Sequence, residues 1–472
     1  MKLSPLKVLS DAEILQIHEA SLDILENCGV KIGSPRMFSF LQAQGLPGDA
    51  EKQIVRFPRT ALEEALERAP SQFEVYDREG SFAFLLGDGD SKIAAGHNAV
   101  FWVDSDSGAT RYSTVADVEL FARLCDRLEC IDMIGIPVMP QDVPEPRNSL
   151  PYGVRAVIEN SRKPIFFSTD NARINRAVMH LAEAAFGGDF RTQVYGITQL
   201  SPTSPLFWEE GVLEAILDTV QTAVPLAILP EPNAGLSAPY TLAGLLTVNN
   251  AECLSGLAMI EMLKPGTKVL YANSWTVTDM RGASALVGST ETTICRVAGA
   301  QLARFYHLPC HTTAPNSDNH AHDEQNAWEK TFSTFCSVGA GNDLIVNCGM
   351  FATGLTCSHE QLIMDEEISA MAKRIAAGVR VTPETLATDL IKQVGPRGDF
   401  MTTEHTIRRL RGDEFLAPRV SVRTSRAIWE AAGSKDTYQM AREQVRKLSK
   451  TAGARIDPER AAKLAEIMQS LG

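Results

Sequence analysis

The sequence lacks the marks of a secreted or membrane-spanning protein. No run approaches the roughly 18 uninterrupted apolar residues of a membrane-spanning helix. The opening segment, MKLSPLKVLSDAEIL, has no apolar core of the signal-peptide kind. The nine cysteines include no C-x-x-C pair, a pattern typical of reduced thiols and not of a disulfide framework. We therefore expect a soluble, cytoplasmic protein.

Several functional classes are disfavoured by what else is missing. Positive charge is scarce: 45 Lys and Arg stand against 58 Asp and Glu, for a net charge of −13. That balance argues against nucleic acid or an anionic membrane surface as a partner. The sequence contains no glycine-rich phosphate loop after a strand-like segment, and no G-x-S-x-G or H-E-x-x-H motif. Nucleotide binding, serine hydrolysis and zinc proteolysis therefore have no motif to support them.

From residue 130 onward, short apolar runs alternate with longer amphipathic segments. The short runs, which we interpret as strands, occupy residues 131–138, 164–167, 193–198, 225–229, 268–272, 309–313, 343–348 and 361–364. Strands that are apolar on both faces are typical of a buried parallel sheet. Eight strand–helix units within about 250 residues favour a closed barrel over an open doubly wound sheet. The sequence therefore predicts an α/β protein with a (β/α)8 TIM barrel over residues 130–378.

The flanking regions read differently. Residues 1–129 mix helical spacing with short strand-like pieces between residues 73 and 112, which we expect to form a small antiparallel sheet. This α+β extension should pack on the barrel. Residues 379–472 contain charged segments with helix start signals. We expect these C-terminal helices to wrap the barrel or to form a subunit contact, so a homo-oligomer is expected.

Aromatic residues recur at or after the predicted strand ends, where a TIM barrel places its working residues. Four of them could converge over the mouth of the barrel: Phe167, Tyr271, Trp275 and Phe351. Aromatic faces attract a quaternary ammonium by roughly 0.5–2 kcal/mol per ring. A ring cage would therefore suit such a cation, which cannot donate a hydrogen bond. The alternative is that these rings only pack in the core or beneath a lid.

Polar side chains at the strand ends form a second candidate group. The set comprises Gln199, Glu231, Asn273, Asn316, Asp318, His320 and His322. Most of them crowd one loop after the sixth predicted strand, where they could orient a substrate. The alternative is local helix capping, for which Ser, Asp and Asn are the preferred residues. Capping accounts for one or two of these side chains and leaves the others unexplained.

The histidines of this loop also allow a metal interpretation. His320 and His322 form an H-x-H pair, with His311 nearby in the sequence. Zinc takes such ligands, and a metal-dependent barrel hydrolase is therefore one alternative. The pair follows the strand, however, and no third ligand stands at a known spacing. We expect no metal site. His97 and His359 are isolated, as structural histidines commonly are.

Three segments resemble a known family. The run D-S-D-S-G-A-T-R-Y-S-T-V-A-D-V at 104–118, the loop P-N-S-D-N-H-A-H-D-E-Q-N-A-W-E-K at 315–330 and the segment S-H-E-Q-L-I-M-D-E-E-I at 358–368 look like the trimethylamine methyltransferase superfamily. The resemblance extends over nearly the whole chain. Founding members carry pyrrolysine in the barrel, whereas this chain has only standard residues. It therefore looks like the branch that demethylates quaternary amines such as glycine betaine.

The resemblance implies methyl transfer from the amine to cobalamin, a corrinoid carried by a partner protein and not by this chain. A quaternary amine needs a dry pocket, a cage and in-line placement, and no catalytic acid or base. A betaine carboxylate would need donors, for which His97, Asn273, Asn316 and His320 are the candidates. Gln199, Glu231, Asp318 and His322 are expected to face the corrinoid partner. A non-catalytic quaternary-amine binding protein remains a further alternative.

Overall fold

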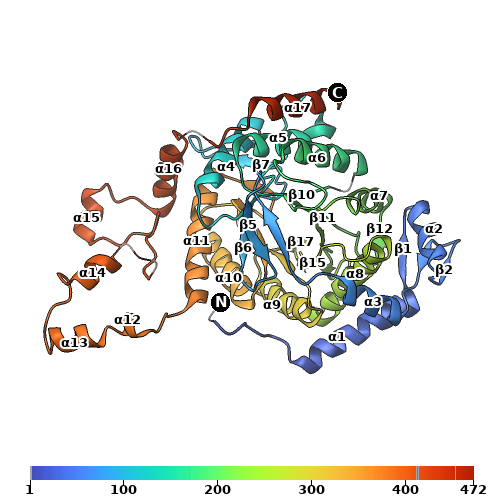
Figure 1. Ribbon diagram of the computed structural model, residues 1–472, viewed down its shortest axis with the longest axis horizontal. Coiled ribbons are helices and arrows are strands. Elements are labelled where there is room, and N and C mark those ends of the chain that lie inside the picture. The colour runs from blue at the N-terminus through green and yellow to red at the C-terminus, as the bar shows by residue number, and fades with distance from the viewer. Residues whose placement is uncertain (1–2, 170, 411, 413, 452, 472) are drawn as a thin grey trace.

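A closed barrel of eight parallel strands forms the centre of the computed structural model (Figure 1), which describes residues 3–169, 171–410, 412, 414–451 and 453–471. Around the barrel the order is β10-β11-β13-β15-β18-β19-β6-β9. In chain order the strands are β6 (Lys92–Ala95), β9 (Met133–Gly135), β10 (Ile165–Ser168), β11 (Gly196–Leu200), β13 (Leu226–Ile228), β15 (Val269–Asn273), β18 (Cys310–Thr313) and β19 (Leu344–Cys348). The predicted (β/α)8 barrel is confirmed.

One predicted strand is wrong. Residues 361–364 lie inside helix α11 (His359–Ala377), and the remaining barrel strand is β6, which pairs with β19 and β9. The Ser358 hydroxyl caps α11 by accepting the Gln361 N–H at 3.1 Å. A short apolar run does not by itself distinguish a strand from a buried helical turn. The barrel sheet therefore begins at residue 92, inside the segment that the sequence assigned to the N-terminal extension.

Helices surround the barrel, one after each strand. They are α4 (Val115–Arg127), α5 (Ser149–Asn160), α6 (Ala172–Ala185), α7 (Glu210–Thr219), α8 (Leu242–Leu263), α9 (Thr290–Phe305), α10 (Glu324–Ala340) and α11. Side chains that alternate along each strand face either these helices or the barrel interior. Residues of the interior form a separate apolar cluster that includes Ala94, Met133 and Phe166. The barrel is thus filled by side chains and is not an open pore.

A hairpin of β4 (Phe73–Tyr76) and β5 (Phe82–Leu86) closes one end of the barrel. Its Val75 and Leu86 are fully buried and belong to the interior cluster. Val75 also forms a bridge with Val194, just before β11 begins, so the hairpin lies at the N-terminal end of the strands. The predicted antiparallel sheet at 73–112 is therefore wrong, because its segments divide between this hairpin, the barrel and a third sheet.

Two small sheets stand at the opposite end, formed by segments that follow barrel strands. One contains β14 (Asn233–Ala234), β16 (Thr276–Asp279) and β17 (Ser284–Leu286). The other contains β20 (Met350–Phe351), β21 (Thr356–Cys357), β7 (Phe101–Val103) and β8 (Thr110–Tyr112). Since the N-terminal end is closed, these sheets border the mouth of the barrel.

The N-terminal segment packs along the outside of the barrel. It comprises α1 (Asp11–Asp23), η1 (Ile24–Cys28), β1 (Val30–Ile32), α2 (Pro35–Ala43), β2 (Gly48–Asp49), β3 (Ile54–Val55) and α3 (Arg59–Arg68). Both α1 and α3 contact α8. The β1 strand also pairs in parallel with β12 (Phe207–Trp208), which follows β11. This region therefore shares its core with the barrel helices.

The C-terminal helices divide into two groups (Figure 1). Helix α16 (Thr437–Leu448) packs on α11, and α17 (Pro458–Gln469) packs on α6. The other group projects away from the barrel and consists of α12 (Pro383–Leu386), α13 (Thr388–Val394), α14 (Glu404–Arg409) and α15 (Arg426–Ala431). None of these four has a buried residue. Among the described residues, no helix combines the length and apolar character needed to cross a bilayer.

Candidate active site at the barrel mouth

Three rings meet at the top of the barrel interior. The Phe166 ring lies 5.2 Å from the His311 ring and 5.6 Å from the His97 ring, measured between centroids. Phe166 and His311 come from β10 and β18, and His97 follows β6. His311 is fully buried, and His97 is half-buried. Phe166 is a member of the interior cluster, and His97 lies beyond the C-terminal end of β6, on the side away from the β4–β5 hairpin.

Both histidines are neutral at pH 7. Desolvation, with a smaller contribution from the neighbouring His97, lowers the pKa of His311 to about 3. Desolvation also lowers the pKa of His97 to about 4, against a smaller opposite effect of the nearby Asn347 side chain. Among the described residues, neither ring nitrogen of His311 has a hydrogen-bond partner. A buried polar atom without a partner costs about 1–3 kcal/mol. The unpaired ring nitrogens of His311 therefore lower the stability of the fold and remain available to a ligand.

An asparagine pair joins the ends of two strands beside His97. The Asn347 amide donates to Asn316 Oδ1 at 2.9 Å, and the Asn316 amide donates to the Thr313 carbonyl at 3.1 Å. Asn347 has a φ of 127°, outside the regions that most residues adopt, and such strain concentrates at functional sites. Its Oδ1 is buried and has no partner in the described part of the chain. The pair therefore adds a second available polar group to the mouth.

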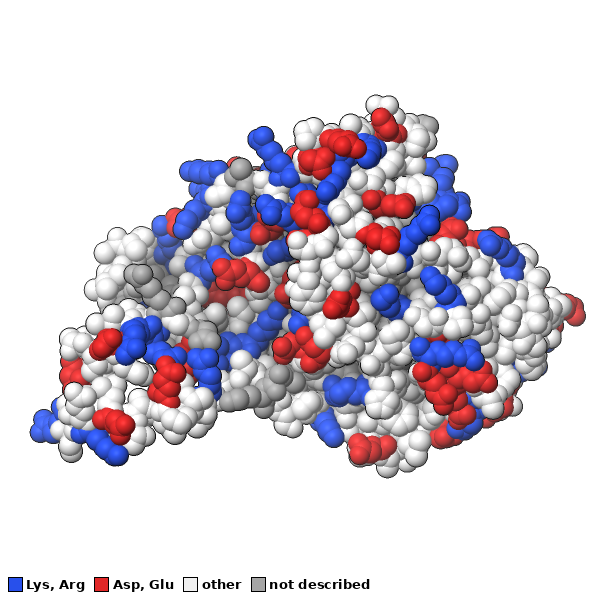
Figure 2. Space-filling view, in the orientation of Figure 1, with Lys and Arg blue, Asp and Glu red and all other residues white. Residues whose placement is uncertain are grey.

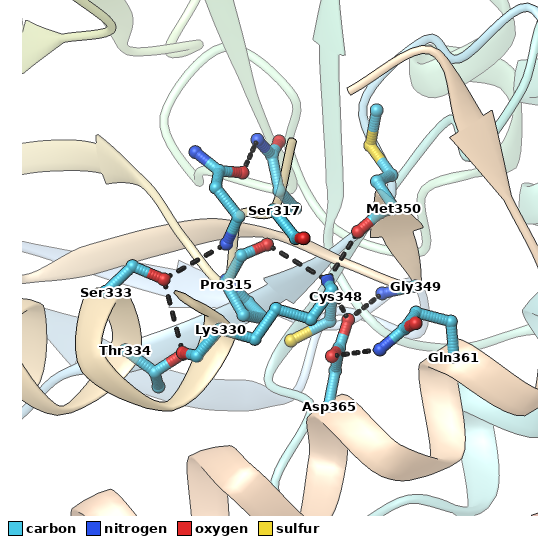
Figure 3. Close-up of polar contacts among 12 residues, drawn as sticks. Pro315, Ser317, Lys330, Ser333, Thr334, Cys348, Gly349, Met350, Gln361 and Asp365 are labelled. Atoms are coloured by element: carbon cyan, nitrogen blue, oxygen red, sulfur yellow. Dashed lines mark hydrogen bonds and ion pairs between the residues drawn. The ribbon is translucent and has the colours of Figure 1, made fainter. Parts of the chain in front are cut away.

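A buried ion pair supports this corner of the mouth (Figure 3). Lys330 Nζ lies 2.9 Å from Asp365 Oδ2, and both side chains are fully buried. The ammonium also donates to the carbonyls of Pro315 and Met350, while Asp365 accepts the Gly349 N–H at 2.7 Å. The pair thereby ties α10 and α11 to the chain segments that follow β18 and β19. It holds the backbone on which Asn316 and Asn347 are placed.

Gln199, near the end of β11, and Glu231, just after the neighbouring β13, lie on another side of the mouth. Gln199 is 2% exposed and its Oε1 has no partner among the described residues. Glu231 is reached by solvent, yet the surrounding protein desolvates it enough to raise its pKa to about 7, against a smaller opposite effect of a hydrogen bond with Ser274. This carboxyl group titrates near neutrality, and a bound cation would favour its charged form.

The predicted aromatic cage is wrong, because its four rings lie in three different apolar clusters. Phe167 packs with the helices outside β10, Tyr271 and Trp275 pack on the helices outside β15, and Phe351 belongs to a small cluster with Val103. The cause is strand alternation: neighbouring residues point to opposite faces. Phe166 therefore faces the interior while Phe167 does not. The sequence alone does not show which of two alternating sets of strand residues faces the barrel interior.

Hydrogen bonds explain how two of these outward residues are held. The Tyr271 hydroxyl donates to Asn250 Oδ1 of α8 at 3.1 Å. The predicted donor Asn273 also faces the helices: its Oδ1 accepts the Thr312 hydroxyl at 2.7 Å, and its amide nitrogen lies beside Gly299 of α9. Asn273 is therefore placed away from the interior and cannot meet a substrate there.

The loop after β18 has mainly structural contacts. Asp318 accepts the backbone N–H groups of Val287 and Gly288 at 2.8 and 3.0 Å, and burial raises its pKa. Asp323 caps α10. His320 is exposed. Of the loop residues predicted to bind substrate, Asn316 alone is linked to the residues of the mouth.

His322 lies at a different place from the other histidines. Its ring lies 4.6 Å from the Phe351 ring and 4.8 Å from the Tyr438 ring, and its Nε2 is 3.2 Å from Ser358 Oγ. Burial lowers its pKa to about 4. The three histidines of the metal alternative thus occupy the barrel interior, the surface and this ring cluster. Within the described residues, no group of three or more His, Cys, Asp or Glu side chains is arranged to hold a metal ion.

A closed-base barrel with a polar mouth is an enzyme scaffold whose working residues stand at the strand ends. The comparisons define the class further. The family model described as trimethylamine methyltransferase (MTTB) matches residues 1–470. This chain belongs to the trimethylamine methyltransferase family.

Relatives and solved structures agree with that membership. Trimethylamine methyltransferase MttB of Desulfitobacterium hafniense is 31% identical over 92% of this chain and 88% of its own length. MttB of Methanosarcina thermophila is 30% identical over 93% of this chain and 92% of its own length. A glycine betaine methyltransferase of Desulfitobacterium hafniense is 27% identical over 98% and 97%. Monomethylamine methyltransferase (MtmB) of Methanosarcina barkeri covers 95% of both chains at 13% identity with a TM-score of 0.50, which shows a shared fold.

Proposed function

We propose that this protein removes a methyl group from a small quaternary amine, glycine betaine, and transfers it to the reduced corrinoid of a partner protein. The proposal rests on the kinds of side chain found at the mouth of this member of the trimethylamine methyltransferase family. Phe166, His97 and His311 present neutral rings, and Glu231 supplies a carboxyl group that titrates near pH 7. Rings and a carboxylate attract a quaternary ammonium. The nine free thiols support a reducing cytoplasm as its location.

The reaction places modest demands on the protein. One methyl group passes to the reduced cobalt of the partner, and the electron pair of the broken C–N bond stays on nitrogen. A neutral tertiary amine leaves, and no proton is gained or lost. The side chains of this mouth would therefore bind and orient the amine and exclude water, without acting as acid or base. Neutral His97 and His311 suit this role, because they would not repel the cation.

Glycine betaine also carries a carboxylate, whose desolvation must be offset by donors. The neutral His311 ring has one N–H, and the Gln199 amide has two. Both side chains are buried, and the two ring nitrogens of His311 have no partner in the described part of the chain. These residues replace Asn273 and His320 as the proposed carboxylate donors. The similarity to a glycine betaine methyltransferase over nearly the full length of both chains supports the same substrate.

The test is incubation of the purified protein with Co(I) cobalamin and a panel of amines. We expect methyl-Co(III) absorbance with glycine betaine, and less with trimethylamine or a longer betaine. Calorimetry with glycine betaine runs beside it. Binding without methyl transfer, also in the presence of a cognate corrinoid protein, would favour a non-catalytic binding protein. Failure of every amine to bind or react would reject the proposal.

A further inference from the structure

Helix α10 has its polar and apolar faces reversed. Its buried side carries Lys330, Ser333 and Thr334, which form the hydrogen bonds described above or bond to the helix backbone. Its outer side carries Trp328 and Phe332, which are 54% and 64% exposed. A surface helix normally turns its apolar stripe toward the core and its polar face to water. An outer face of this kind indicates that another protein surface covers it.

A second uncovered apolar surface lies on the projecting segment between residues 379 and 418, which we name the arm. Helices α12, α13 and α14 of the arm have no buried residue. Its exposed large apolar side chains include Val381, Leu386, Ile391, Phe400, Met401, Ile407, Leu410, Phe415 and Leu416. A hollow of about 840 Å³ lies between α12, α13 and α14, and Leu386, Leu390 and Val394 form part of its wall. The arm thus offers a concave apolar surface, while α10 offers a convex one.

The base of the arm is fixed. Arg374 of α11 donates to the Glu414 carbonyl at 3.0 and 2.8 Å. Glu367 of α11 accepts the backbone N–H groups of Arg419 and Val420 at 2.7 and 2.6 Å. Figure 2 shows the arm standing away from the body of the molecule, with charged residues of both signs among uncharged ones. Both ends of the arm are therefore held on α11, and the arm between them projects away from the barrel.

The charge and position of the arm decide among possible partners. Residues 379–418 contain six basic and six acidic side chains, so neither nucleic acid nor an anionic membrane would gain from its charge. The arm leaves α11 at Ala377, next to Lys373, whose ammonium pairs with Asp132 just before β9. That is the closed end of the barrel, whereas a methyl acceptor must approach the mouth. A second copy of this chain carries the matching surface itself.

We propose that the arm of one copy covers the outer face of α10 in a second copy, and that the second arm covers the first α10 in return. Such a reciprocal contact closes on itself with twofold symmetry. The arm is long enough to supply the roughly 20–30 residues per side of a standard interface. This inference is independent of the proposed substrate, because no residue of the mouth takes part.

The first experiment measures mass in solution by sedimentation velocity at micromolar concentration. The wild type should exceed the 51.4 kDa of one chain by at least twofold. Trp328→Glu with Phe332→Glu should give a monomer, and so should Leu386→Glu with Leu390→Glu. Leu15→Glu adds one negative charge at a 48% exposed apolar position on α1 and should keep the wild-type mass. A monomeric wild type, or paired variants that keep its mass, would overturn the proposal.

The second experiment locates the contact without destabilising the chain. A photo-reactive residue replaces Ile391, which is 54% exposed on α13. Irradiation should give a two-chain product whose cross-linked peptides come from α10, and the Trp328→Glu with Phe332→Glu variant should not form it. Cross-links confined to one chain, or to a surface other than α10 and its neighbour α9, would exclude this arrangement. Both results are read without any activity assay.

Discussion

The two ends of the barrel differ in polarity: the base is apolar, whereas the mouth contains buried polar groups. At the base, the β4–β5 hairpin inserts fully buried Val75 and Leu86 into an interior cluster that is entirely apolar. At the mouth, His311, Gln199 and Asn347 are buried or nearly buried and each holds polar atoms with no partner among the described residues. Unpaired buried polar atoms lower stability. The comparison indicates that the apolar base stabilises the fold, whereas the mouth keeps unpaired polar groups for binding at a cost in stability.

The comparison predicts that mutations at the two ends separate stability from substrate binding. The Lys330–Asp365 pair should give the largest effect, because it is buried and holds the mouth in place. Lys330→Met leaves an unpaired carboxylate and should lower the free energy of unfolding by about 3–5 kcal/mol. Lys330→Met with Asp365→Leu should be less destabilised than that single variant. Chemical denaturation measures both, and an unstable double variant combined with a stable single one would contradict this account.

A base mutation should affect stability alone. Leu86→Ala removes a fully buried side chain from the interior cluster and should cost about 2–5 kcal/mol of unfolding free energy. Methyl transfer to Co(I) cobalamin, measured well below the melting temperature, should keep the wild-type KM for the amine. A raised KM would show that the base and the mouth are coupled, and the comparison would then fail.

The sequence revealed the barrel more readily than the site. Seven of its strands follow from short apolar runs, since buried parallel strands are apolar on both faces. β6 was misassigned because its segment, Lys92–Ala95, stands among antiparallel hairpins. Residues 361–364 read as a strand because four apolar-rich residues fit either element. Local patterns thus identify strands well but do not say which sheet each strand joins.

The site depended on orientation, which the sequence does not encode locally. Glu231, His97 and Asn316 were singled out by their positions after strands, and all three lie at the mouth. Phe166 was passed over for Phe167 because a one-residue difference in parity exchanges the two faces of a strand. His311 was considered only as a metal ligand, and its interior position follows from the same parity. Lys330 lay within a recognised motif, yet its pairing with Asp365 depends on how α10 and α11 pack.

Removing an unpaired polar group from the mouth should stabilise the fold. His311→Leu deletes two ring nitrogens that have no partner in the described structure and should raise the free energy of unfolding by about 1–3 kcal/mol. Methyl transfer should fall at least tenfold. The native pKa of about 3 lies below the usual value, so the unfolded state binds more protons and the wild type loses stability as pH falls below about 6.5. The variant should lose less between pH 7 and pH 4 in denaturation experiments. A variant that is both less stable and fully active would reverse the roles assigned to the two ends.

Glu231→Gln should give the smallest effect and the one most specific to binding. The side chain is reached by solvent, so its loss should hardly change stability. Its pKa of about 7 means that the charged form, which attracts a cation, disappears as pH falls below 7. For the wild type, KM for the quaternary amine should therefore rise severalfold between pH 8 and pH 6. The Gln variant should show the higher KM at both pH values, with kcat little changed. Because an amide stays neutral throughout, a pH dependence of KM that survives in this variant would assign the titration to another group of the mouth.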